Sequence, residues 1–98
     1  MTPHSARVAD AEAEEVAVEA FGYIASDERL RDRFLAVSGL TPEGIRSAAR
    51  EDGFLAGVLA FLMEHEPSLL AFAESSGRSP SVVAAAAARL APARPGPD

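Results

Sequence analysis

Hydrophobic residues recur along this chain at spacings of three and four, which is the period of an α-helix. Between about Asp10 and Ala25 they form one apolar face, and Glu15 and Glu19 lie on the opposite side. The apolar face consists of Ala13, Val16, Ala17, Ala20, Phe21 and Ile24. Asp10 belongs to the residue types that cap helix N-termini. Because no stretch alternates polar residues with β-branched or aromatic ones, the pattern predicts an all-α protein.

Glycine, proline and capping residues mark two further helices. The second is expected to begin at Ser26 or Asp27 and to end at Gly39, because glycine readily adopts the left-handed conformation that closes many helices. Its buried stripe is predicted to consist of Leu30, Phe34 and Val37. A short third helix follows Thr41 and Pro42, a cap residue and a proline at the first helical position.

The fourth helical segment is apolar on every side. Residues 53–63 read GFLAGVLAFLM, without a charged side chain. At about 100° per residue the large side chains cover more than half of the circumference. The remaining stripe of small residues would let a neighbouring helix approach closely, and it consists of Ala56, Gly57 and Ala60. Since a helix with no polar face is normally enclosed, we expect a compact bundle of five to six short helices around this central apolar helix, at about residues 53–65.

Two more helices are expected after this central segment. Pro67 starts the fifth helix and Gly77 ends it. Ser79 and Pro80 repeat the pairing of a cap residue with a proline, which predicts the start of the sixth helix. The inward face of that helix is predicted to consist of Val83, Ala86 and Leu90.

The length of 98 residues suits one domain. We expect a flexible N-terminus at residues 1–9, a single helical domain at 10–91 and a disordered, proline-rich C-terminal tail at 92–98. The longest apolar run, residues 53–63, is shorter than the roughly 20 residues that a membrane-spanning helix needs. These features predict a cytoplasmic protein without a membrane span.

Charge and residue types argue against several functions. The net charge of −6 repels phosphate, so a nucleic-acid partner is not expected. All nine basic residues are arginine, which excludes lysine Schiff-base chemistry. The chain has no cysteine, and therefore no disulfide or thiol nucleophile. We expect no cofactor and no metal.

The middle of the chain resembles a known family, over about Glu14 to Leu90. The matching features are the Arg33-Phe34-Leu35 step into Ser38-Gly39-Leu40, Pro42, Ile45-Arg46, Gly53-Phe54-Leu55, Glu66-Pro67, Leu69-Leu70 and Phe72. They are similar to domain of unknown function family 3572, although Ser38 stands where that family usually carries threonine. The resemblance implies a small all-α bacterial protein without an assigned activity, and it supplies no catalytic residue.

Three apolar residues fall outside the predicted inward faces of their helices. They are Val18, Leu70 and Val82. Such outliers either cover a neighbouring helix or form a docking surface. Arg29 and Arg33 share one face of the second helix and could bind an acidic partner. These five residues are the candidate interaction surface, and the leading interpretation is a non-catalytic module for protein–protein interaction or self-association.

A DNA-associated regulator is the first alternative. Residues 69–90 have the spacing of a helix-turn-helix-like segment. Its second helix offers no side chain that could make bidentate contacts with bases. This hypothesis therefore requires a dimer that gathers Arg78, Arg89 and Arg94 on one face.

An enzyme is the second alternative. His65 lies between Glu64 and Glu66, so a carboxylate could orient it as a general base. The only other histidine is His4, near the N-terminus. This hypothesis requires His65 to lie in a concave pocket, whereas a solvated helix end would account for the same residues.

Overall fold

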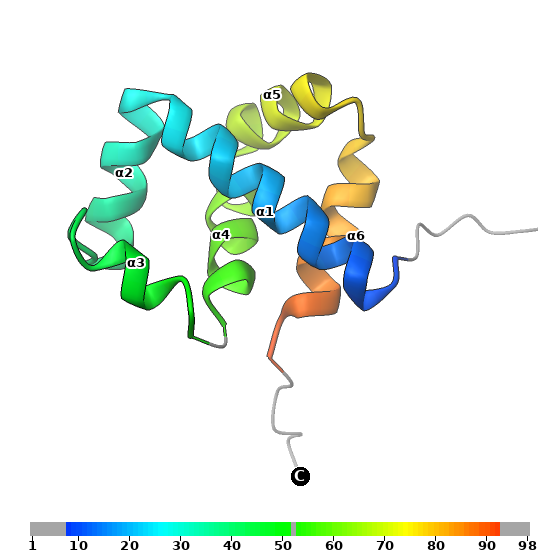
Figure 1. Ribbon diagram of the computed structural model, residues 1–98. Helices are drawn as coiled ribbons and strands as arrows, with labels where there is room; N and C mark the ends of the chain where they lie inside the picture. The colour runs from blue at the N-terminus through cyan, green and yellow to red at the C-terminus, as the bar shows by residue number, and fades with distance from the viewer. Residues whose placement is uncertain (1–7, 52, 93–98) are drawn as a thin grey trace, which may run out of the picture.

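The computed structural model describes residues 8–51 and 53–92 (Figure 1). The described residues form six helices and no strand, which confirms the all-α prediction. The helices are α1 (Asp10–Ser26), α2 (Glu28–Ser38), α3 (Ile45–Ala48), α4 (Phe54–Met63), α5 (Glu66–Ser76) and α6 (Pro80–Leu90). Val8, within the segment expected to be flexible, is buried against the core. Residues 1–7 and 93–98 lie outside the described residues.

Helix α1 is the element around which the others pack. It contacts α2, α4, α5 and α6, and its most extensive contact is with α6. In Figure 1 it crosses the bundle between α2 and α6, in front of α4. Its predicted inward face is buried except for Phe21, which is half-buried. Helix α4 packs against α1, α5 and α6 and carries the fully buried Val58, Leu59 and Leu62, so α1 and α4 together form the centre of the bundle.

The helix ends confirm most of the local signals in the sequence. Asp27 caps α2, because its carboxylate accepts a hydrogen bond from the Leu30 amide at 3.0 Å. Gly39 and Gly77 close α2 and α5 with φ of 76° and 74°, a left-handed conformation that costs glycine little. Asp10 does not cap α1: it is the first helical residue, and its side chain pairs with Arg89 of α6 instead.

Ser79 caps α6 as predicted. Its hydroxyl oxygen accepts a hydrogen bond from the Val82 amide at 3.3 Å, and Pro80 occupies the first helical position. The third helix is shorter than its start signal implies. Thr41 accepts the Gly44 amide, but regular helix covers only Ile45–Ala48, and none of those four residues is buried.

Aromatic rings join α2 to the rest of the core. Phe34 of α2 lies edge-on to Phe61 and Phe54 of α4, with ring centroids 5.3 and 6.2 Å apart. Phe21 of α1 stacks edge-on to Phe54 at 5.2 Å. Edge-to-face pairs of this kind stabilise a core beyond the area that they bury. The rings also separate the backbones of α2 and α4, which leaves space beside them.

The stripe predicted for α2 is only partly buried. Phe34 is buried and Leu30 is half-buried, as expected, but Val37 is 70% exposed. The prediction for Val37 was therefore wrong. The last turn of α2 extends past the aromatic contacts with α4, so Val37 has no inward surface to pack against.

The helices of the described residues differ in length and in apolar content, the two properties that a membrane span requires. No single one is both long enough and apolar enough to cross a bilayer. Helices α4 and α5 reach that length and apolarity only together, and their axes bend by 111° at the break between them.

Candidate functional site

An apolar groove runs between α2 and α4, with a volume of about 430 Å³. We call it the α2–α4 groove. Three aromatic rings line it, those of Phe34, Phe54 and Phe61. Val37 and Leu40 form its wall on the side of α2. This volume lies within the range of about 300–1,000 Å³ that is usual for binding pockets.

The floor of the groove is the small-residue stripe of α4. The buried side of this helix carries Val58, Leu59 and Leu62. At about 100° per residue, the opposite side carries Gly57 and Ala60, and Gly53, the left-handed N-cap residue, precedes them. All three are exposed. A helix with no polar face was predicted to be enclosed, but within the described residues no segment covers this side. We call Gly53, Gly57 and Ala60 the uncovered face of α4.

A second apolar groove borders the same residues on the side of α6. It has a volume of about 610 Å³, and its far wall is formed by Ala87, Leu90, Ala91 and Pro92. Ala56 completes its floor beside the uncovered face. The uncovered face is therefore the shared floor of two apolar grooves, one against α2 and one against α6.

Gly57 shows how open this floor is. A Cβ atom built on Gly57 would have no heavy atom within 4 Å outside its own helix. Glycine in a helix interior lowers stability by roughly 1 kcal/mol relative to alanine, and no described residue packs against Gly57 closely enough to require it. The usual physical reason for such a glycine is the close approach of another backbone.

The rim of the α2–α4 groove carries its polar groups. They are Arg33, Ser38, Glu64 and His65. Arg33 is exposed and makes no ion pair with a described carboxylate. The groove thus combines an apolar interior with a few charges at its edge, the composition typical of a binding site.

His65 lies at the edge of the groove, as the enzyme hypothesis requires, and Glu64 lies beside it. The Nδ1 atom of His65 is 2.7 Å from the hydroxyl oxygen of Ser68. Ser68 is buried and stands in the first turn of α5, which begins directly after His65. Glu66 is exposed and does not line the groove. Among the described residues no three histidine, cysteine or acidic side chains gather as a metal site would require.

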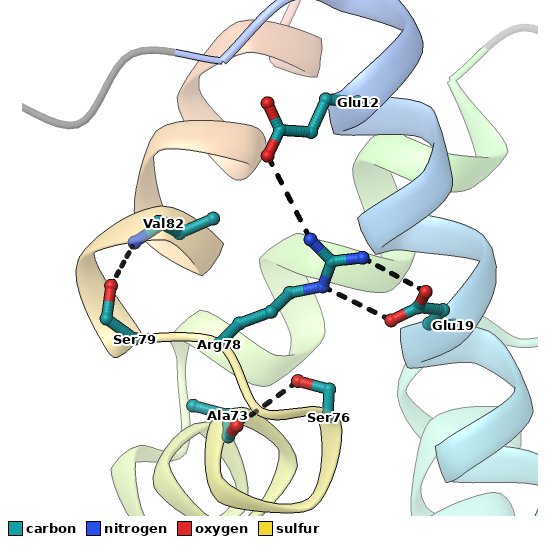
Figure 2. Close-up of polar contacts among 7 residues, drawn as sticks. All are labelled: Glu12, Glu19, Ala73, Ser76, Arg78, Ser79 and Val82. Atoms are coloured by element: carbon teal, nitrogen blue, oxygen red, sulfur yellow. Dashed lines mark hydrogen bonds and ion pairs between the residues drawn. The ribbon is translucent and has the colours of Figure 1, made fainter.

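Two of the arginines invoked for DNA binding, Arg78 and Arg89, contact α1 instead. Figure 2 shows the contacts of Arg78. Arg78, in the turn between α5 and α6, donates two hydrogen bonds to the Glu19 carboxylate, at 3.2 and 3.0 Å. Its guanidinium also lies 3.9 Å from Glu12. The hydrogen bond to Glu19 raises the pKa of Arg78, against a smaller opposing effect of burial.

Arg89 is paired in the same way. Its guanidinium donates a hydrogen bond to Asp10, which raises the pKa of Arg89. Arg94 lies outside the described residues. Carboxylates of α1 therefore neutralise both described arginines of the helix-turn-helix-like segment.

The structure distributes the five predicted surface residues over several elements. Val18 is 57% exposed on the outer side of α1, and Leu70 is 45% exposed on α5. Val82 is half-buried and packs against the core. Arg29 and Arg33 are both exposed, but only Arg33 lines the α2–α4 groove. The five residues do not form one site.

The groove residues that the sequence analysis missed are Val37, Leu40, Phe54 and Phe61. In the sequence all four look like ordinary core residues, because periodicity marks an apolar face without showing whether anything covers it. The one usable signal was the small-residue stripe of α4, which was interpreted as a contact with a neighbour in the same chain.

Comparison with known proteins gives one match. A family model described as "Protein of unknown function (DUF3572)" matches residues 10–93, most of the chain. No curated protein and no solved structure matches.

Proposed function

This chain belongs to the DUF3572 family of proteins of unknown function, and we propose that it is a non-catalytic self-association module. The proposed docking site is the α2–α4 groove, and its proposed occupant is a helix of a second copy of the chain. The observation that carries the proposal is the uncovered face of α4: a helix without a polar side chain presents one side to solvent between two apolar grooves.

The shape of the groove supports a helix as the occupant. A floor of Gly57 and Ala60 lets a second helix approach closely, and the exposed side chain of Val37 would cover its flank. Helix-in-groove recognition places an apolar stripe of one helix in an apolar groove of the partner. An exposed apolar groove bordered by polar residues is the kind of surface at which proteins meet.

Charge supports a second copy as the source of that helix. Helix α1 carries five carboxylates and no basic residue, from Asp10 to Glu19. Exposed Arg33 lines the α2 side of the groove, and exposed Arg29 precedes it by one helical turn outside the groove. One chain thus presents both members of a complementary pair of surfaces, and complementary charges guide association.

The contacts of His65 and of the arginines weigh against the two alternatives. The His65–Ser68 pair is local to the start of α5, and the Ser68 side chain is buried, so its hydroxyl is poorly placed to attack a substrate. Arg78 and Arg89 already pair with carboxylates of α1, whereas binding to phosphates needs several available cations. A non-catalytic module accounts for both sets of contacts.

The test is the solution mass of the wild-type chain and of Gly57→Gln, measured by light scattering over a concentration series. Glutamine favours helix over glycine and has open space at this position, so the variant should fold at least as stably while its side chain blocks the groove. We expect the wild-type mass to rise above 10.2 kDa with concentration and the variant to remain at 10.2 kDa.

Ala71→Gln is the matched control, because Ala71 is exposed on α5 and lies outside both grooves. It should assemble like the wild type. A wild-type chain that keeps the mass of one chain at every concentration would contradict the proposal, and so would a Gly57→Gln variant that assembles normally.

A further inference from the structure

We infer that the helix entering the α2–α4 groove is α1 of the second copy, inserted through its outer face with Val18 as the anchor. This inference rests on the proposed self-association and assigns its geometry. The contact would join two different surfaces of the chain, one contributed by each copy.

The outer face of α1 has the pattern of a helix that docks in a groove. Its exposed apolar positions are Ala11, Val18, Gly22 and Ala25. They are separated by seven, four and three residues, which places them along one side of a helix. Val18 is the only large side chain among them and is 57% exposed. A Cβ atom at Gly22 would meet nothing within 4 Å outside α1, so this side of the helix is open as well.

The charges beside Val18 match those beside the groove. Glu14 and Glu15 stand one turn before Val18, on either side of it at about 100° per residue. Both are exposed, and neither forms an ion pair with a described arginine, whereas Asp10, Glu12 and Glu19 face Arg89 or Arg78. The charge of Glu15, after that of Glu19, also helps to raise the pKa of Arg78, so Glu14 is the more available of the two carboxylates.

On the receiving side, Arg33 lines the groove and Arg29 precedes it by one helical turn. Neither arginine pairs with a described carboxylate. Val18 entering the groove would therefore carry Glu14, with Glu15 beside it, towards the guanidinium groups of Arg33 and Arg29.

Geometry prevents a chain from filling its own groove in this way. The inward face of α1 packs against α4, whose uncovered face points to the opposite side. The outer face of α1 and the floor of the groove consequently lie on opposite sides of the molecule. A contact between two different surfaces is heterologous, so each added copy leaves one groove and one α1 face available for the next.

A mixing experiment tests this arrangement. Val18→Glu removes the anchor and leaves the groove intact, while Gly57→Gln blocks the groove and leaves α1 intact. We expect each variant alone to associate about tenfold or more weakly than the wild type, as loss of a central contact does. Mixed in equal amounts, they should form a complex of two chains and nothing larger, because only one groove and one α1 face remain functional.

Matched variants test the named residues. Leu70→Glu, which also replaces an exposed apolar residue by a charge, should assemble like the wild type. Arg33→Glu should weaken assembly, whereas Arg31→Glu, the same charge change next to Asp32 on another face of α2, should not.

The outcomes separate this inference from the proposed function. Wild-type self-association that survives Val18→Glu, or a mixture that forms no two-chain complex, would overturn the assignment of α1 while leaving self-association standing. A wild-type chain that never associates would overturn both.

Discussion

Two helix contacts in this protein use side chains of opposite size, and only one of them is closed. Helices α1 and α6 make the most extensive helix contact, and their buried residues are mostly alanine and valine, among them Ala17, Ala86 and Val83. Helices α2 and α4 meet mainly through phenylalanine rings whose centroids are 5.3–6.2 Å apart. Short side chains let two helix backbones approach, whereas rings keep them apart.

The difference explains where the groove forms. On its inner side, α4 packs against α1, α5 and α6, and Val58, Leu59 and Leu62 are fully buried there. On the α2 side, the rings fill the inner part of the space, and the outer part stays open beside Val37 and Gly57. The groove is therefore a consequence of side-chain size at the contact, and it leaves apolar surface for another molecule.

The same substitution, alanine to leucine, should give the largest difference in stability when it is made in each of the two contacts. Ala86→Leu adds three carbon atoms to a fully buried position of α6 and should lower the free energy of unfolding by about 1–3 kcal/mol, because there is no space for them. Ala60→Leu makes the same change on the uncovered face and should alter the free energy of unfolding by less than about 0.5 kcal/mol. Urea denaturation at low protein concentration measures both. Equal losses would mean that α4 is covered on both sides.

Glycine substitutions should give the next largest contrast. Gly77 closes α5 with φ of 74°, so Gly77→Ala should cost about 1–2 kcal/mol of unfolding free energy, the penalty of a left-handed conformation for alanine. Gly57→Ala should instead add about 0.5–1 kcal/mol, because the helix interior favours alanine and the added Cβ has open space. Thermal unfolding of the two variants should shift in opposite directions, and a loss of stability at Gly57→Ala would contradict the open floor.

Substitutions of the arginines should have the smallest effect on the free energy of unfolding. Arg78→Gln removes the two hydrogen bonds to Glu19 that join α1 to the α5–α6 turn. We expect a loss of about 1 kcal/mol or less, since the pair is partly exposed to solvent. Arg33→Gln should leave the unfolding free energy unchanged, because Arg33 has no ion pair to lose among the described residues. A chemical denaturation series compares them, and a larger loss at Arg33 would indicate a hidden structural role.

Local chemistry made most of the fold predictable. Asp27, Gly39, Gly77 and Ser79 act at the helix ends where the sequence placed them, because caps and left-handed glycines depend on only a few neighbouring residues. The inward face of α1 followed from its period of three and four. Asp10 was misplaced by one position because Arg89, 79 residues away in the chain, pairs with its carboxylate.

The candidate site was predictable only in part. Spacing identified the small-residue stripe of α4 and placed Val18 and Leu70 outside the inward faces of their helices, but the exposure of these two residues is a finding of the structure. The exposure of Val37 could not, since it depends on how far the rings of Phe34 and Phe61 hold α2 from α4. The spacing of hydrophobic residues identifies an apolar face. The distance between two helices depends instead on contacts between side chains that are far apart in the chain.

The central claim is that a second copy covers the uncovered face of α4, and thiol labelling tests it most directly. The chain has no cysteine, so Ala60→Cys provides a single thiol on that face, and Ala71→Cys provides a control on exposed α5. The thiol of the Ala60→Cys variant should react more slowly with the label as the protein concentration rises. The thiol of the Ala71→Cys control should react at a constant rate. Equal rates for the two variants at every concentration would contradict the claim.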